Sequence, residues 1–148
     1  MNYRFSRFCR RGLVGAAVTL SAAIAPLLSM PTAAAASTPA GACGSGFREI
    51  DHHDLPNATI YLLYNDNDNC VVTWKTKYLG TASETNASIE LAGQRSTAVS
   101  DSGKYKYYAG PVKIAAKGKC IQWEGEAQPP GTVATIENYW KSQASHCG

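Results

Sequence analysis

The apolar residues that follow position 46 fall in short runs rich in Val, Ile, Tyr, Thr and Trp, separated by turn residues. Runs of this length and composition are typical of β-strands, and no segment combines a helical period with capping residues. Several short strands joined by turns indicate an antiparallel sandwich or a small barrel-like domain. The sequence therefore predicts an all-β fold with strands over residues 47–52, 58–64, 70–78, 86–92, 104–109, 111–116, 119–125 and 132–137.

Two of these segments alternate clearly between the two faces of a strand. Residues 70–78 divide into two sets, one of Cys70, Val72, Trp74 and Tyr78 and the other of Thr73, Lys75 and Lys77. In residues 104–108 the same alternation places Tyr105 and Tyr107 together. Side chains of one set are expected to share an environment, because they project from the same face.

Residues 1–36 have a different composition, with four Arg and no acidic residue, followed by an apolar, Ala-rich run. This order is typical of a secretory signal peptide, and the small residues Ala33–Ala36 suit a peptidase that cuts after Ala36. We expect a signal peptide over residues 1–36, a flexible lead-in over 37–46 and a single β domain over 47–148. No later run approaches the roughly 18 apolar residues of a membrane span, so no transmembrane segment is expected after cleavage.

Removal of the signal peptide changes the charge balance. The whole chain carries 14 Lys and Arg against 11 Asp and Glu, a net charge of +3. Four of the basic residues lie in the first 36 positions, so ten remain against eleven acids, a net charge of about −1 for the rest. A nucleic-acid-binding face needs positive charge to displace counterions from phosphates, so no nucleic-acid partner is expected.

Four cysteines follow the expected cleavage site: Cys43, Cys70, Cys120 and Cys147. An even number in a short exported chain predicts two disulfides. The spacing within the first two and within the last two is equal, with 26 residues between the cysteines in both cases. We therefore expect the local bridges Cys43–Cys70 and Cys120–Cys147, while the crossed and nested pairings stay open. Redox and zinc sites need a short C-x-x-C spacing, which does not occur here.

The only cluster that resembles a site is Asp51–Asp54, with the sequence Asp-His-His-Asp. On an extended strand His52 and His53 point to opposite sides, each with one neighbouring carboxylate, so at most two of the four groups converge. A metal ion would need further ligands, with His146 and Asp101 as candidate donors. A polar turn is the other interpretation, and no cofactor is expected.

Signatures of catalysis are missing from the sequence. There is no G-x-S-x-G motif, the three histidines lie towards the two ends of the predicted domain, and its four cysteines are expected to be paired. The chain is therefore not expected to be an enzyme.

Aromatic residues are plentiful, with 8 Tyr and 3 Trp in the chain. Exposed aromatic rings stack on sugars or form protein contacts, although strand alternation places about half of them inside. The candidate surface-contact residues are Trp74, Trp123, Tyr105, Tyr107 and Tyr108.

Six short motifs extend over nearly the whole region after residue 36: Ala42–Gly46, Ile60–Asn65, Asn69–Thr73, Tyr108–Val112, Lys119–Trp123 and Ser145–Gly148. Together they resemble the actinobacterial spore-associated protein A family, small secreted proteins linked to spore and aerial-growth surfaces. The resemblance implies a β-rich disulfide domain with an extracellular location, and it supplies no catalytic residue. The acidic, proline-containing segment 124–130 departs from the family pattern, so we expect the final hairpin to differ from that of the family.

These observations predict a non-enzymatic secreted protein associated with unidentified components of the spore or hyphal surface. One alternative is a secreted inhibitor of a hydrolase, such as a protease or an amylase, which would present Gly80–Thr85 or Ser96–Lys104 as a rigid loop. A small glycan-binding module is the other alternative.

Overall fold

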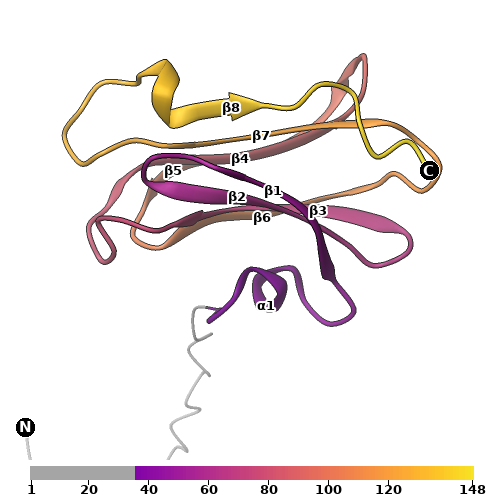
Figure 1. Ribbon diagram of the computed structural model, residues 1–148, viewed down its shortest axis with the longest axis horizontal. Coiled ribbons are helices and arrows are strands. Elements are labelled where there is room, and N and C mark those ends of the chain that lie inside the picture. The colour runs from indigo at the N-terminus through magenta and orange to yellow at the C-terminus, as the bar shows by residue number, and fades with distance from the viewer. Residues whose placement is uncertain (1–35) are drawn as a thin grey trace, which may run out of the picture. The chain divides into compact units, whose positions relative to one another are not determined.

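The computed structural model describes residues 36–148, so the predicted signal peptide lies, except for Ala36, outside the described residues. Two four-stranded antiparallel sheets pack face to face (Figure 1). The first sheet has the order β1 (Arg48–Asp54), β2 (Ala58–Tyr64), β3 (Asp68–Lys75) and β6 (Tyr108–Ala115). The second has the order β5 (Gln94–Tyr105), β4 (Ser83–Leu91), β7 (Ile121–Ala127) and β8 (Tyr139–Lys141). The predicted all-β sandwich is confirmed.

The core lies between the sheets and follows the two-residue period of the strands. In the first sheet Ile60 pairs with Thr73 and Leu62 pairs with Val71. All four side chains face the second sheet and are buried. The second sheet contributes a matching row of buried residues, chiefly Ala87, Ile89, Ile121 and Trp123. Each strand of the core therefore buries one of its two faces against the other sheet.

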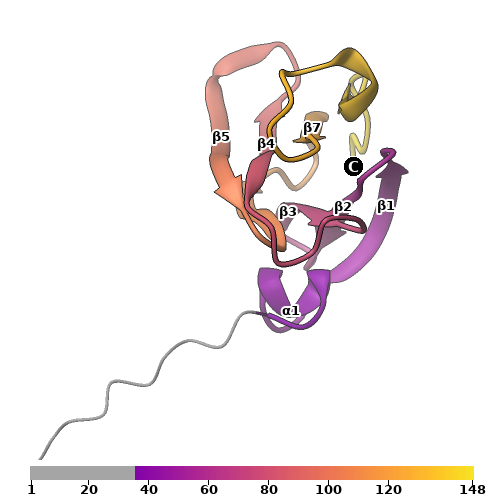
Figure 2. The ribbon, with the colours of Figure 1, turned by 90° about the vertical axis from the view of Figure 1, so that its left-hand side faces the viewer.

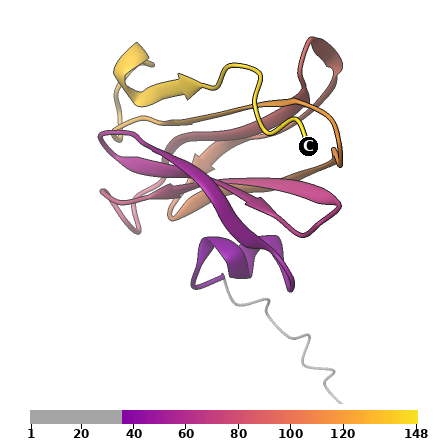
Figure 3. The ribbon, with the colours of Figure 1, turned by 45° about the vertical axis from the view of Figure 1, so that its right-hand side comes forward.

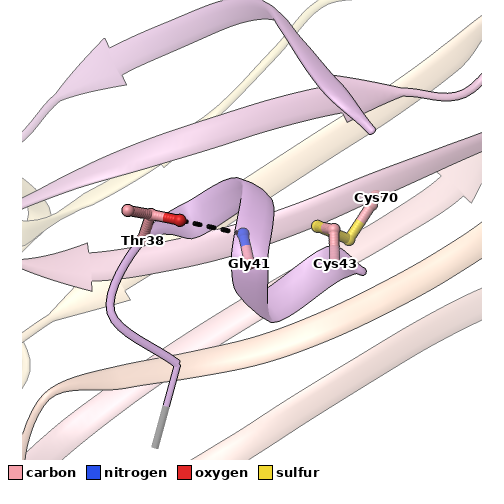
Figure 4. The surroundings of a disulfide bond; sticks show 4 residues. All are labelled: Thr38, Gly41, Cys43 and Cys70. Atoms are coloured by element: carbon pink, nitrogen blue, oxygen red, sulfur yellow. Dashed lines mark hydrogen bonds between the residues drawn. A yellow bond between two sulfur atoms is a disulfide. The ribbon is translucent and has the colours of Figure 1, made fainter. Parts of the chain in front are cut away.

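The outer face of the first sheet is covered as well, by the one-turn helix α1 (Pro39–Cys43) (Figures 1 and 3). A second buried cluster forms there from Cys43, Leu63, Cys70 and Val72. The disulfide Cys43–Cys70 joins the helix to β3 near the start of the strand (Figure 4). This helix lies within residues 37–46, the segment expected to be a flexible lead-in.

The local sequence accounts for α1. The Thr38 hydroxyl accepts a hydrogen bond from the backbone N–H of Gly41 at 3.0 Å, which caps the first turn (Figure 4). Pro39 occupies the first helical turn, where it has no backbone hydrogen bond to lose. The second disulfide, Cys120–Cys147, holds the C-terminal segment beside β7, where Ile121 and Ser145 form an isolated bridge. Both predicted disulfides are present.

The structure corrects the predicted strands at three places. The strand expected over 104–109 is split by a turn, because β5 ends at Tyr105 and β6 starts at Tyr108. Most of β5 was not predicted, since residues 94–103 are largely polar. The strand expected over 132–137 is wrong: this segment is a loop followed by the 3-10 turn η1 (Ile136–Asn138), and the last strand is β8. Within residues 36–148 no helix combines the length and the apolar character needed to cross a membrane.

Candidate functional site

The Asp51–Asp54 cluster lies on β1, at the edge of the first sheet. Its side chains alternate as predicted: His52 pairs with Tyr61 across the outer face, whereas His53 pairs with Ile60 on the face turned towards the second sheet. The His53 ring stacks on the Trp140 ring of β8, with the centroids 4.1 Å apart and the planes 8° apart. This stack brings the edge strand β1 of the first sheet into contact with the edge strand β8 of the second.

The two candidate donors from elsewhere in the chain behave differently. His146 reaches the cluster, with its Nε2 3.5 Å from Oδ2 of Asp51. Asp101 lies away from it and accepts hydrogen bonds from the Tyr105 hydroxyl and, at 2.7 Å, from the backbone N–H of Gly110. No group of three His, Cys, Asp or Glu residues within 36–148 is arranged to hold a metal ion. The cluster therefore joins the first sheet to the C-terminal segment.

The predicted surface-contact aromatics separate into three environments. Trp123 is 1% exposed and lies in the core between the sheets, so its assignment as a surface residue is wrong. Trp74 and Tyr108 are half-buried and stack with their centroids 4.7 Å apart. Tyr105 and Tyr107 do not share a strand face, because the chain turns between them. Tyr105 is half-buried and its hydrogen bond to Asp101 raises the pKa of its hydroxyl, while Tyr107 is exposed.

The most exposed large apolar side chains lie in loops rather than on strands. The β1–β2, β3–β4, β5–β6 and β7–β8 connections all lie at one end of the sandwich, which faces the viewer in Figure 2. Five exposed apolar residues belong to these loops, and we call them together the apolar loop end: Tyr78, Leu79, Tyr107, Val133 and Ile136. Of these five residues, sequence reasoning had named only Tyr107 as a surface contact, because it followed strand periodicity. The signal was an isolated Leu, Val or Ile within a turn-rich segment.

Hydrogen bonds between the loops hold this end of the molecule together. The backbone N–H of Thr76 donates to the carbonyl of Asn57 at 2.8 Å, which joins the β3–β4 and β1–β2 loops. Gly80 donates to the carbonyl of Lys106 at 3.1 Å, and the Asn57 amide donates to Oδ1 of Asn138 at 2.7 Å. Because all four loops are thus bonded to a neighbour through Asn57 or Gly80, the apolar side chains are presented on an ordered base.

A buried lysine reinforces the base of the same loops. Lys75 is 2% exposed and its ammonium donates to the carbonyls of Thr81 and Tyr105 at 2.8 and 3.2 Å and to the Ser83 hydroxyl at 2.8 Å. It forms no ion pair with any residue in 36–148. Burial lowers the pKa of the ammonium group. Lys75 therefore serves as a central hydrogen-bond donor that connects the β3–β4 loop to the end of β5.

The two segments proposed for an inhibitory loop are not both loops. Ser96–Lys104 lies inside β5, paired with β4, so its assignment as a loop is wrong. Of Gly80–Thr85, only the first three residues precede β4, and Gly80 is bonded to the β5–β6 turn. The exposed part of this candidate element is therefore short.

The comparison with known proteins gives one informative relationship. The chain is 34% identical over 117 residues to the protein named Spore-associated protein A of Streptomyces coelicolor (strain ATCC BAA-471 / A3(2) / M145). The matched region covers 77% of this chain and 73% of that protein. No family model and no solved structure matches the chain. On the extent and identity of this match, the chain belongs to the spore-associated protein A family.

Proposed function

We propose that this protein is a non-enzymatic, exported protein that associates with the outer surface of spores or hyphae. The observation that carries the proposal is membership of the spore-associated protein A family. The two disulfides support export, because such bridges persist in oxidising compartments outside the cytosol. The partner is a component of the spore or cell surface.

The apolar loop end is the contact surface that fits this function best. The part of the chain after residue 36 carries almost no net charge, so electrostatic attraction alone gives little adhesion. Val133 and Ile136 are 82% and 86% exposed, and burying side chains of this kind stabilises a contact by up to roughly 1.5–3 kcal/mol each. Because the loops are already ordered, contact costs little conformational entropy.

Fractionation of a sporulating culture tests the association directly. Spores and hyphae are washed in turn with high salt, detergent and reductant, and each wash is probed for the protein. We expect retention through the salt wash and release by detergent, since an apolar contact survives screening of charges. Recovery from the culture medium alone would contradict the proposal.

A matched pair of variants tests the contact surface. Leu79→Ser combined with Ile136→Ser removes two apolar side chains from the apolar loop end, and we expect the retained fraction to fall several-fold. Val99→Ser removes an apolar side chain that is 40% exposed from β5, away from these loops, and is expected to leave retention unchanged. Equal retention of both variants would assign the contact to another surface.

A further inference from the structure

The outer face of the second sheet carries a row of polar side chains from all four of its strands. Ser88 of β4 pairs with Ser100 of β5 and with Glu124 of β7, and Glu124 in turn pairs with Lys141 of β8. Together with their neighbours these residues line a groove, which we call the polar groove. It is defined by Ser88, Glu90, Arg95, Glu124, Tyr139 and Lys141.

The polar groove is recessed rather than flat. Ser88 and Glu90 are only 6% and 7% exposed, although both project from the outer face of β4. Two adjoining cavities of about 340 and 420 Å³ lie over this face and share Glu90, Arg95 and Lys141 in their walls. Cavities of roughly 300–1,000 Å³ are the size that holds small ligands or single units of a chain.

The charged groups at the bottom of the groove are held in place by one another. The Lys141 ammonium donates to Oε1 of Glu90 at 2.7 Å and lies 3.3 Å from Oε2 of Glu124. The Tyr139 hydroxyl donates to the same Glu124 oxygen at 2.9 Å. The bond to Glu90 raises the pKa of Lys141, so the ammonium stays protonated at neutral pH. The donors and acceptors of the groove are therefore preorganised.

The charges of the polar groove cancel. Two carboxylates, Glu90 and Glu124, face two cations, Arg95 and Lys141. Arg95 forms no ion pair with any residue in 36–148, so its guanidinium remains available as a donor. A balanced groove selects against nucleic acid and other strongly charged polymers. A protein partner is disfavoured because the centres of protein interfaces are depleted of charged residues.

We propose that the polar groove binds a neutral glycan chain. Sugar hydroxyls both donate and accept hydrogen bonds, so they match a surface that alternates carboxylates, serine hydroxyls and a free guanidinium. The partly exposed Tyr139 ring supplies a face on which a sugar ring stacks. Neighbouring strands lie about 4.8 Å apart, close to the length of one sugar unit in an extended chain, so successive units meet successive strands. This site is separate from the apolar loop end and goes beyond the function proposed above.

Calorimetric titration of the secreted protein with cellohexaose and hexa-N-acetylchitohexaose tests the inference. We expect at least one of these neutral chains to bind. Arg95→Gln, which removes one free donor, should weaken binding by about fivefold, the loss of one net hydrogen bond. Tyr139→Ala should weaken it similarly through loss of stacking, while Tyr139→Phe keeps the ring and should bind more tightly than Tyr139→Ala.

Lys119→Gln is the matched control, because it removes one positive charge from the exposed β6–β7 turn, which lies outside the groove. It should bind as the wild type does. No binding of either glycan at about 10 mM, a range in which even weak sites are occupied, would overturn the inference, as would binding that Arg95→Gln and Tyr139→Ala leave unchanged. Stronger binding of the acidic polysaccharide alginate would also overturn it.

Spore retention of the same variants separates this inference from the proposed function. Retention without glycan binding would leave the surface association standing and remove the groove as a glycan site. Glycan binding by a protein found only in the culture medium would support the groove as a glycan site and contradict the surface association.

Discussion

Lys75 shows how one residue is placed against the usual preference of its type. Lysine is almost never fully buried, yet Lys75 lies on the inner face of β3 and its ammonium is satisfied by neutral acceptors alone. Alternation of residues 70–78 grouped Lys75 with Thr73, and both side chains point towards the second sheet. The sequence showed that they share a face but not that this face is the buried one.

Replacement of Lys75 by Met tests its role. Lys75→Met removes the ammonium group that donates hydrogen bonds to Thr81, Ser83 and Tyr105. Buried acceptors that lose their partner destabilise the folded state. We expect the free energy of unfolding at pH 7 to fall by about 1–3 kcal/mol in urea titration. The exposed Lys119→Met should change it little, and equal stability of both variants would contradict the role assigned to Lys75.

The lowered pKa of Lys75 also predicts a pH dependence. Between this lowered pKa and the ordinary lysine pKa of 10.5, the unfolded chain binds the proton and the folded protein does not. The free energy of unfolding should therefore rise with pH across this window through Lys75. Urea titrations of the wild type and Lys75→Met from pH 7 to pH 10.5 isolate the contribution of Lys75. The difference between their free energies of unfolding should shrink as the pH falls. A parallel pair of profiles would contradict the lowered pKa.

Gly125 illustrates a second residue-scale constraint, a close approach between the sheets. A Cβ at this position of β7 would overlap Oγ1 of Thr73 and lie 2.7 Å from Cγ1 of Ile60. We expect Gly125→Ala to lower the free energy of unfolding by about 1–3 kcal/mol through overpacking. The double variant with Thr73→Ala should recover part of this loss in thermal unfolding, whereas additive effects would place the strain elsewhere.

At the scale of elements, the strands were predictable where apolar residues alternate and not where the strand is polar. Residues 58–64 form β2 over the predicted range. Residues 94–103 carry few apolar side chains, because β5 is the edge of its sheet and most of its side chains are exposed. Edge strands form through backbone pairing with a neighbour, here β4, and this pairing leaves little trace in composition.

The two disulfides give an element-scale prediction, because both join cysteines 27 positions apart. Because each bridge removes loop-closure entropy from the unfolded chain, both should contribute about the same to the free energy of unfolding, on the order of 3.5 kcal/mol. Cys43 and Cys70 are also buried in the cluster between α1 and the first sheet, while Cys147 is exposed. We expect the pair Cys43→Ala and Cys70→Ala to destabilise the protein more than Cys120→Ala and Cys147→Ala, as measured by urea unfolding. The reverse order would show that α1 contributes little packing.

At the scale of the whole molecule, apolar exposure is concentrated at one end, and this predicts chromatographic behaviour. Leu79→Ser combined with Ile136→Ser should elute earlier from a phenyl column than the wild type. We expect the retention factor to fall about threefold or more, since part of the burial energy of two apolar side chains is lost. Val99→Ser is the control and should shift far less. Equal shifts would mean that the apolar loop end is not the main adhesive surface.

The sequence alone determined the strand-rich architecture and the sets of side chains that share a strand face, and its cysteine spacing favoured the two local disulfides without excluding the other pairings. These features follow from local periodicity and from spacing along one chain. The tertiary structure decided which face of each strand is covered. It buried Trp123 and Lys75, left Trp74 half-exposed and brought the four loops of the apolar loop end together. It also aligned β4, β5, β7 and β8 into the polar groove. The physical reason is that strand pairing and sheet packing join residues far apart in the chain, and a two-residue period contains no information about the partner.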